Sequence, residues 1–168
     1  MEPSQIPTLK TGRLFLRPLS KTDIEFIYKI RTDPNVNQFL DRSIPSQPQE
    51  AAKFINSIIE GNLYYWCIMY RQKAVGTICL WNMQEDEVEV GYELLPEFQH
   101  RGIMHEALQR LINFCSDTLQ LKNVKASTHR NNQPSINLLL RNRFTFKEDD
   151  DDDFQCFELN LLEQGTGL

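Results

Sequence analysis

The sequence predicts a mixed α/β fold: one seven-stranded, mostly antiparallel sheet combined with about four helices. The chain has 168 residues, 40% hydrophobic and 24% charged, which suits one globular domain with an adequate core. Segments with a two-residue period are interspersed with segments of helical period, which indicates strands and helices packed on one sheet. Strand 87–95, helix 102–118 and strand 123–128 form a β-α-β unit, whose two strands should be parallel.

The first quarter of the chain predicts a strand and two helices. Residues 13–19, "RLFLRPL", alternate polar and apolar side chains, as a half-buried strand does. The spacing of Thr22 and Glu25 is that of a capping box, and the helix that follows ends at Pro34. Its apolar face holds Ile24, Ile27, Tyr28 and Ile30. A second helix is predicted over 48–59, with Pro48 in its first turn.

The middle of the chain predicts three successive strands. "LYYWCIMY" and "AVGTICLWN" are apolar runs joined at "RQK", so they indicate a hairpin. The segment 87–95 alternates strictly. Val88, Val90, Tyr92 and Leu94 share one face, and Glu87, Glu89, Gly91 and Glu93 share the other.

The last third predicts a long helix, a strand, a short helix and a closing hairpin. The helix over 102–118 places Ile103, Ala107, Leu108, Leu111, Ile112 and Cys115 on one side. "NVKAST" is the strand, and "NNQPSINLLLRN" is a helix with Pro134 near its start. "FTFK" and "FQCFELN" form the hairpin around an acidic run.

Composition restricts the classes of partner and the compartment. A net charge of -5 argues against bulk binding of nucleic acid or anionic membrane. The four cysteines are scattered among apolar neighbours, which is typical of buried reduced thiols and suggests no metal site. No apolar run approaches a membrane span, so we expect a cytoplasmic protein. We expect one domain over 1–168, with flexible ends at 1–8 and 161–168.

The loop "QHRGIM", residues 99–104, lies where a strand hands over to a helix. A helix start presents unpaired backbone N–H groups and a partial positive charge, and Gly102 lets an anion approach the backbone closely. His100 and Arg101 add side-chain donors. The pattern favours a pyrophosphate cradle, although a plain helix start would have the same sequence. It matches neither the P-loop nor the dinucleotide motif.

In its context this loop resembles the coenzyme A signature Q-x-x-G-x-[GAM] of the GNAT acetyltransferase superfamily, in particular its RimJ/RimL-type branch of ribosomal-protein-alanine N-acetyltransferases. "TGRLFLRPLSKTD", "AVGTICL" and the segment from Asn132 to Phe144 resemble three further parts of that branch, so the resemblance covers about residues 9–160. Two positions depart from the pattern. Arg143 stands where the branch usually has glycine, and Met104 takes the last slot of the cradle.

The resemblance implies that an acetyl group moves from acetyl-CoA to a primary amine by direct attack in a ternary complex. It also implies that strands 87–95 and 123–128 splay apart, and that pantetheine lies between them. The acceptor would be a protein N-terminus or a small amine. The residues that it implies for coenzyme A are Leu94, Leu95, Gln99, His100, Arg101, Gly102, Ile103, Met104, His105 and Asn132.

Three candidate catalytic side chains follow from the same resemblance. Glu89 matches the glutamate of the branch's E-[IV]-G-Y segment and would accept the proton of the ammonium, and Glu93 is a second candidate for this base. Ser135 matches the serine that protonates the departing thiolate. A backbone N–H near Leu94 or Leu95 would hold the oxyanion. The alternatives are solvated strand glutamates and a serine that only begins a helix.

The sequence says less about which residues would bind the acceptor amine. Residues 36–47 are mostly polar and contain Pro45, and Pro48 follows them directly. We expect mobility and acceptor specificity in this segment. Five aromatic residues are candidates for the wall of the site or for the core: Phe39, Tyr64, Tyr65, Trp66 and Trp81. The six acidic residues 148–153 are either a solvated hairpin tip or an attractor for a polyamine-like molecule or a basic protein N-terminus.

Two further function classes compete with the enzyme. A non-catalytic acyl-CoA-binding or protein-interaction module could keep the same fold. An RNA- or ribosome-binding factor is disfavoured by the acidic balance. The sequence does not decide between a monomer and a homodimer.

Replacing Asp149 to Asp153 by asparagine should raise the KM for a cationic acceptor, because the local negative potential would be lost. The effect should shrink as salt is added. Steady-state kinetics at low and high ionic strength test this, and an unchanged KM at low salt contradicts it.

Overall fold

One mixed sheet organises the molecule, as predicted. The computed structural model describes residues 5–163. Within that range the strand order is β1-β2-β3-β4-β5-β6-β8-β7, and only β5 and β6 are parallel neighbours. The strands are β1 (Leu9–Lys10), β2 (Leu14–Pro18), β3 (Tyr65–Tyr70), β4 (Lys73–Trp81), β5 (Glu87–Leu94), β6 (Asn123–His129), β7 (Thr145–Asp149) and β8 (Phe154–Asn160).

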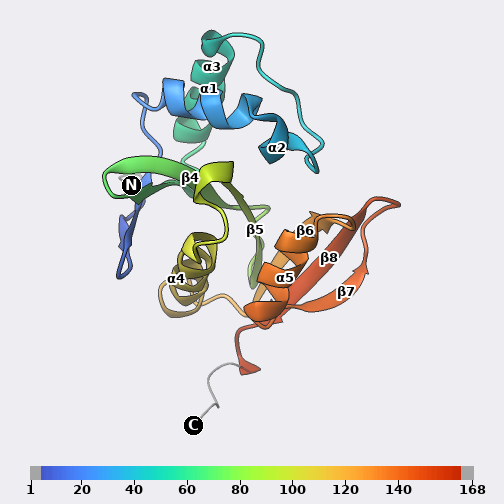
Figure 1. Cartoon of the computed structure of the whole chain (residues 1–168). Coiled ribbons are helices and arrows are strands. Elements are labelled where there is room, and N and C mark those ends of the chain that lie inside the picture. The colour runs from blue at the N-terminus through green and yellow to red at the C-terminus, as the bar shows by residue number, and fades with distance from the viewer. Residues whose placement is uncertain (1–4, 164–168) are drawn as a thin grey trace.

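The helices cover the two faces of this sheet (Figure 1). They are α1 (Ile24–Thr32), α2 (Pro34–Asn37), α3 (Pro48–Glu60), α4 (Ile103–Asp117) and α5 (Gln133–Arg141), with a 3-10 turn at Pro96–Phe98. The two elements that the sequence did not predict, β1 and α2, have two and four residues, too few for a periodic pattern.

Two apolar clusters hold the layers together. On one face, Ile27 of α1 and Ile55 of α3 pack with Tyr65 and Cys67 of β3. On the other face, Leu108 of α4 belongs to a larger cluster that also contains the predicted apolar side of β5. Trp66, fully buried in that larger cluster, donates from Nε1 to Pro7 O at 2.8 Å. The predicted apolar faces of α1, α4 and β5 are therefore confirmed by burial.

The parallel pair β5–β6 is short. Its register holds for Glu87 with Asn123, Val88 with Val124 and Glu89 with Lys125, and then stops. Both strands continue beyond these pairs, to Leu94 and His129. The predicted splaying of the two strands is thus present, and it opens toward the C-terminal ends of both.

The turn between β2 and α1 is built on a buried ion pair. Asp23 is 6% exposed and accepts from Arg17 Nη1 at 2.9 Å, Arg17 Nη2 at 2.6 Å and Ser20 N–H at 2.8 Å. Thr22 instead contacts the Ser20 hydroxyl at 3.1 Å, and no side chain caps α1. The predicted capping box of Thr22 and Glu25 is therefore wrong, because Asp23 takes the helix-start position and is occupied by Arg17.

Two smaller expectations concern Arg143 and the two ends of the chain. Arg143, where glycine was expected, has φ 69°, a left-handed conformation that costs a non-glycine residue about 1–2 kcal/mol. The predicted flexible ends lie partly outside the described residues. Within them, Leu161 is buried and donates its N–H to Lys122 O at 2.8 Å.

The cysteines are unpaired thiols, and burial raises the pKa of Cys67, Cys79 and Cys115 to about 12. Among the helices of residues 5–163, none combines the length and apolar character needed to cross a membrane.

Asp23→Asn should destabilise the protein by about 2 kcal/mol at pH 7, because the buried side chain would lose its charge-assisted hydrogen bonds with Arg17, which is one third exposed. Burial alone would raise the pKa of Asp23, but the hydrogen bonds from Arg17 and Ser20 lower it overall. The carboxylate therefore contributes stability above the unfolded-state pKa of about 4, and loses it as pH falls through the lower folded-state pKa.

Urea unfolding at pH 7, 4 and 3 checks this expectation. The gap between the wild type and Asp23→Asn should narrow as the pH falls. Asp86→Asn is the matched control, because Asp86 pairs with Lys122 at the surface and should change stability by about 0.5 kcal/mol. Equal losses in the two variants contradict the role given to Asp23.

Candidate active site

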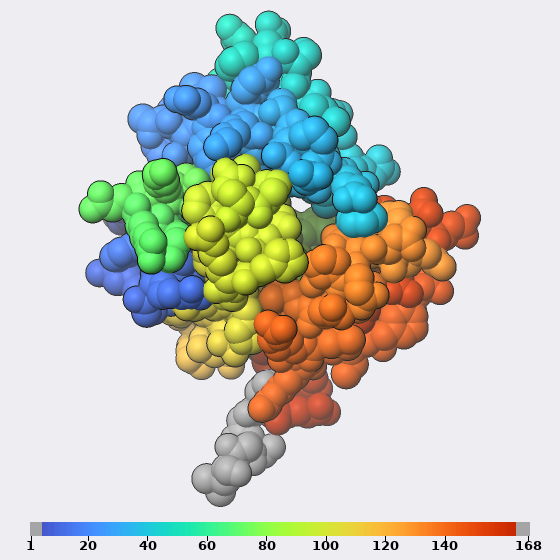
Figure 2. All heavy atoms as spheres, in the orientation of Figure 1, coloured from blue at the N-terminus to red at the C-terminus, as the bar shows by residue number. Residues whose placement is uncertain are grey.

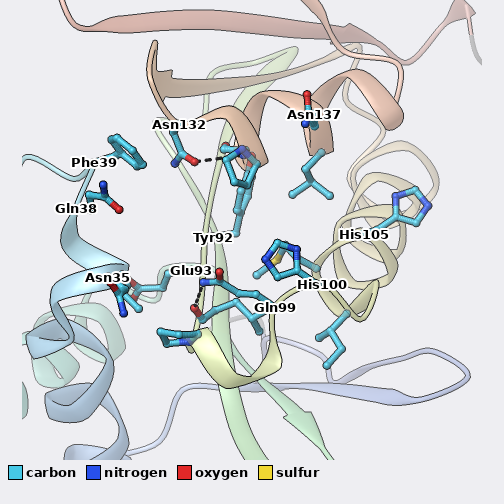
Figure 3. Close-up of a pocket in the computed structure, with 18 of the residues that line it drawn as sticks. Asn35, Gln38, Phe39, Tyr92, Glu93, Gln99, His100, His105, Asn132 and Asn137 are labelled. Carbon is cyan, nitrogen blue, oxygen red and sulfur yellow. Dashed lines mark hydrogen bonds between the residues drawn. The ribbon is translucent and has the colours of Figure 1, made fainter.

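A cavity of about 750 Å³ lies where β5 and β6 diverge. Its walls are residues 35–40 after α1, the end of β5, the loop from Pro96 into α4, and α5. Figure 2 shows it as a hollow between the blue segment, the yellow-green loop and the orange helix α5. In Figure 3, side chains from all of these segments surround one space. Four parts of the chain, distant in sequence, therefore build one site.

The start of α4 is a ready anion site at one end of this cavity. Gly102 has φ 74°, the left-handed region that favours glycine, and no side chain caps the helix. The first backbone hydrogen bond runs from Glu106 N–H to Gly102 O at 3.0 Å. Within residues 5–163, the N–H groups of residues 103–105 have no partner. They can therefore bind the oxygens of a phosphate or pyrophosphate.

The cradle is held from behind by the turn between β1 and β2. Arg13 donates from Nε to Glu106 Oε1 at 2.9 Å and from Nη1 to Arg101 O at 3.1 Å, and Thr11 also donates to Glu106. Burial would raise the pKa of Glu106, but the donors from Thr11 and Arg13 lower it overall. The one carboxylate in the first turn of α4 is thus neutralised on the side away from the cavity.

Two histidines line the phosphate end, and Arg101 does not. His100, with φ 63°, and His105 both line the cavity. His105 Nδ1 lies 3.0 Å from Asn142 Nδ2, which is a donor, so the ring proton is assigned to Nε2 and can be offered to an anion. The Arg101 guanidinium instead stacks over the Phe98 ring at 5.6 Å.

The edge of β5 is open where the cavity begins. Leu95 N–H donates to Val75 O at 2.9 Å, and the antiparallel ladder pairs Leu94 with Gly76. Because hydrogen-bonded and non-hydrogen-bonded pairs alternate, Leu94 directs its own N–H and C=O to the opposite side, toward the gap. Gln99 Nε2 donates to Leu94 O at 3.1 Å. Leu94 N–H therefore remains available, whereas the predicted alternative, Leu95 N–H, is occupied.

Tyr92 and Ser135 join the two walls of the gap. Their hydroxyl oxygens are 2.8 Å apart, and Ser135 N–H donates to Asn132 Oδ1 at 3.3 Å. Burial raises the pKa of Tyr92 to about 12, although the bond with Ser135 opposes this. The phenol thus stays protonated at neutral pH. Only one of the two hydroxyl protons is needed for the hydrogen bond between Tyr92 and Ser135. The other proton can therefore point into the cavity.

Glu93 is the buried carboxylate of the site. It is 9% exposed and lines the cavity. Its Oε1 accepts from Thr77 Oγ1 at 3.2 Å, and its Oε2 lies 2.7 Å from Arg42 Nη2. A carboxylate that faces a cavity from a mostly buried position can accept a proton from a bound cation.

The predicted site residues are divided by the structure. Glu89 lies at the closed end of the gap, accepts from Asn82 Nδ2 at 3.0 Å, and is outside the cavity lining. Leu95 and Arg101 are also outside it. The cavity brings together Glu93, Leu94, Gln99, His100, Gly102, Ile103, Met104, His105, Asn132 and Ser135. Within the described residues, no cluster of His, Cys, Asp or Glu could hold a metal ion.

The aromatic and acidic candidates are divided as well. Phe39 lines the cavity, its ring 5.3 Å from that of His129, which is 5.4 Å from Phe154. Tyr64, Tyr65 and Trp66 belong to the two cores, and Trp81 is half exposed.

The acidic run covers the last two residues of β7 and the turn into β8. Within it, Asp149 lies 3.7 Å from Arg130, and Asp151 Oδ1 accepts from the N–H groups of Asp153 and Phe154. Part of the run thus shapes the turn itself.

Sequence reasoning missed Tyr92 and Arg42. Tyr92 was assigned to the apolar face of its strand, although its hydroxyl needed a partner once buried, and that requirement was the available signal. Arg42 gave no signal, because an arginine in a polar connection is ordinary on a surface. Only the fold places it against Glu93.

The sequence matches a family model described as "Acetyltransferase (GNAT) domain" over residues 13–145. It is 30% identical over 151 residues to the uncharacterized N-acetyltransferase p20 of Bacillus licheniformis, which covers 84% of this chain and 83% of that protein.

Two solved structures are similar in fold. RimL, the ribosomal L7/L12 alpha-N-protein acetyltransferase, in complex with coenzyme A, superposes with a TM-score of 0.82 at 17% identity over 92% of this chain and 98% of that one. The spermidine N-acetyltransferase from Vibrio cholerae, in complex with CoA and spermine, gives 0.81 at 16% identity over 90% and 98%. At these identities the likeness is one of fold.

Gly102→Ala should weaken acetyl-CoA binding about tenfold, because φ 74° is strained for alanine by about 1–2 kcal/mol and relaxation would disturb the helix start. Titration calorimetry measures the Kd. Gly12→Ala is the matched control, since a Cβ there meets nothing within 4 Å. If the two variants bind equally well, the loop is a plain helix start.

Proposed function

The chain belongs to the acetyltransferase (GNAT) family and is an acetyl-CoA-dependent acetyltransferase, and from this premise we propose that it acetylates a primary amine by direct attack in a ternary complex. The acceptor is a protein N-terminal amine or a small amine. Membership of the family favours this reading over a non-catalytic module with the same fold.

One observation carries the proposal: the cavity joins the anion cradle at α4 to the open edge of β5. A ligand with a pyrophosphate and an extended amide arm fits these two features in that order. The N–H groups of residues 103–105 suit the phosphates, and Leu94 offers strand-like pairing to the amides. Gln99 must release Leu94 O if the arm is to pair there.

The cavity residues at the C-terminal end of β5 and the start of α5 have distinct roles in the proposal. Acetyl-CoA supplies an activated acyl group as a thioester. Glu93 accepts the proton that the ammonium must lose before attack, and Leu94 N–H stabilises negative charge that develops on the acyl oxygen. The hydroxyl pair of Ser135 and Tyr92 donates a proton to the departing sulfur. Glu93 is preferred to Glu89 because it lines the cavity.

A cationic acceptor is the class that the acid near this site suits best. Phe154 follows the acidic run directly, and its contact with His129, and through His129 with Phe39, places the run beyond the cavity wall. A basic protein N-terminus and a polyamine both fit. The structural neighbours include one protein named as an alpha-N-protein acetyltransferase and one named as a spermidine N-acetyltransferase.

Acetyl-CoA at about 100 times its Kd should raise the melting temperature by about 5–10 °C, whereas adenosine diphosphate and a nicotinamide dinucleotide should raise it less. Glu93→Gln should keep this shift and lose turnover about a hundredfold or more on an amine panel. Ser135→Ala should lose less, because the Tyr92 hydroxyl remains.

Glu89→Gln is the matched substitution that decides between the two carboxylates. It should retain most of the turnover, because Glu89 faces Asn82 outside the cavity. A greater loss in Glu89→Gln than in Glu93→Gln would assign the base to Glu89. A melting temperature that does not respond to acetyl-CoA would overturn the proposal as a whole.

A further inference from the structure

Glu93 already has a cation beside it. Arg42 Nη2 is 2.7 Å from Glu93 Oε2, and the two side chains are 18% and 7% exposed. A buried carboxylate is costly without a counter-charge, so this pair neutralises the proposed base when no acceptor is bound. One of the two oxygens that could take the proton of an acceptor ammonium is therefore occupied by another cation.

The contact is close but poorly directed. Neither Arg42 Nη2 nor Glu93 Oε2 has an aligned hydrogen-bond partner within the described residues, although both atoms are buried. Arg42 is instead oriented by its Nε, which donates to Asn37 Oδ1 at 2.8 Å. A guanidinium is a rigid plane, whereas an ammonium is compact and has three donors that can turn toward an acceptor. An ammonium can therefore compete for Glu93 Oε2.

Arg42 also belongs to a weakly tied part of the chain. It lies between α2 and α3, in a segment with neither helix nor strand. Within residues 5–163, the backbone N–H groups of residues 41–44 have no partner, residue 45 is a proline without an N–H, and the last backbone bond before them runs from Leu40 N–H to Asn37 O. The same segment carries Phe39, which lines the cavity and has its ring 5.3 Å from that of His129. Moving Arg42 thus breaks few hydrogen bonds.

We propose that Arg42 is an internal competitor for the acceptor amine: it occupies the cation position at Glu93, and the acceptor binds productively only when its ammonium displaces Arg42. Arg42 thereby sets the affinity for the acceptor and limits it to amines that are cationic when they bind. This inference rests on the proposed role of Glu93.

The exchange balances in charge and protons. Arg42 leaves Glu93 as a cation, because a guanidinium does not give up its proton in proteins. The ammonium replaces it, passes one proton to the Glu93 carboxylate, and becomes the neutral amine that attacks. Arg42 takes part in no proton transfer, so it is a positioning residue that acts through Glu93.

A different reading gives Arg42 the opposite effect. Arg31, whose guanidinium lies 4.0 Å from the Phe54 ring centroid, is near enough that Arg42 lowers its pKa, after the larger effect of burial. Two arginines beside one carboxylate could instead hold an anionic group of the acceptor. Removing Arg42 would then weaken acceptor binding, whereas the proposal requires that it strengthen it.

The kinetic test compares Arg42→Gln with the wild type on a cationic amine. The KM for the amine should fall about fivefold or more, because the competent state no longer has to be freed from Arg42, and the KM for acetyl-CoA should not change. Arg42→Lys keeps the cation and should stay close to the wild type. Arg71→Gln, at the exposed turn after β3, is the control for net charge. A raised or unchanged acceptor KM in Arg42→Gln overturns the proposal.

A second measurement does not depend on turnover. Arg42→Gln leaves Glu93 without its cation, so its melting temperature should fall by about 5 °C or more. Methylammonium chloride should restore part of that loss relative to sodium chloride at the same concentration. Compared with sodium chloride, methylammonium chloride should not raise the melting temperature of the wild type or of the double variant Arg42→Gln with Glu93→Gln.

Failure of rescue by methylammonium overturns the proposal even if the variant is active. If the wild type acetylates no amine but the rescue is seen, the cation position at Glu93 stands and the proposed function fails. The two ideas therefore fail separately.

Discussion

The divergence of β5 and β6 is the constraint on which the rest of the site depends. After three paired residues the two strands separate, and the backbone of β5 is left without a neighbour on one side. Buried backbone groups require partners, so an unpaired strand edge inside a protein is either filled or used. Here Gln99 satisfies Leu94 O, and Leu94 N–H stays available. The gap thus has both the shape and the hydrogen-bonding needs of a site for an extended amide chain.

The charges are arranged to leave that gap usable. At the start of α4, Glu106 is held by Arg13 behind the helix, so the partial positive charge of α4 faces the cavity. At the C-terminal end of β5, Glu93 is balanced by Arg42 from a segment with few hydrogen bonds of its own. Glu106 is neutralised by Arg13 from the turn between β1 and β2, whereas Glu93 is neutralised by Arg42 from the loop between α2 and α3. We regard this difference as the reason that one end suits permanent anion binding and the other suits exchange.

The fold was largely predictable because its elements are long and periodic. The apolar faces of α1, α4 and β5 follow from local spacing, and burial follows the same spacing. The loop from Gln99 to Met104 was also predictable, since glycine at a helix start has a local geometric meaning. The misses were short or tertiary: β1, α2, and the helix start at Asp23, whose partner Arg17 lies six residues away on β2.

By itself, the sequence determined the kind of fold, the family resemblance and the place of the anion cradle, because each depends on neighbours along the chain. The tertiary structure alone decided which side chains meet in the cavity. It placed Glu93 rather than Glu89 at the wall, paired Tyr92 with Ser135, and set Arg42 against the buried carboxylate. Glu89 and Glu93, four residues apart, share a face of β5 but differ in burial, because burial is fixed by elements distant in sequence.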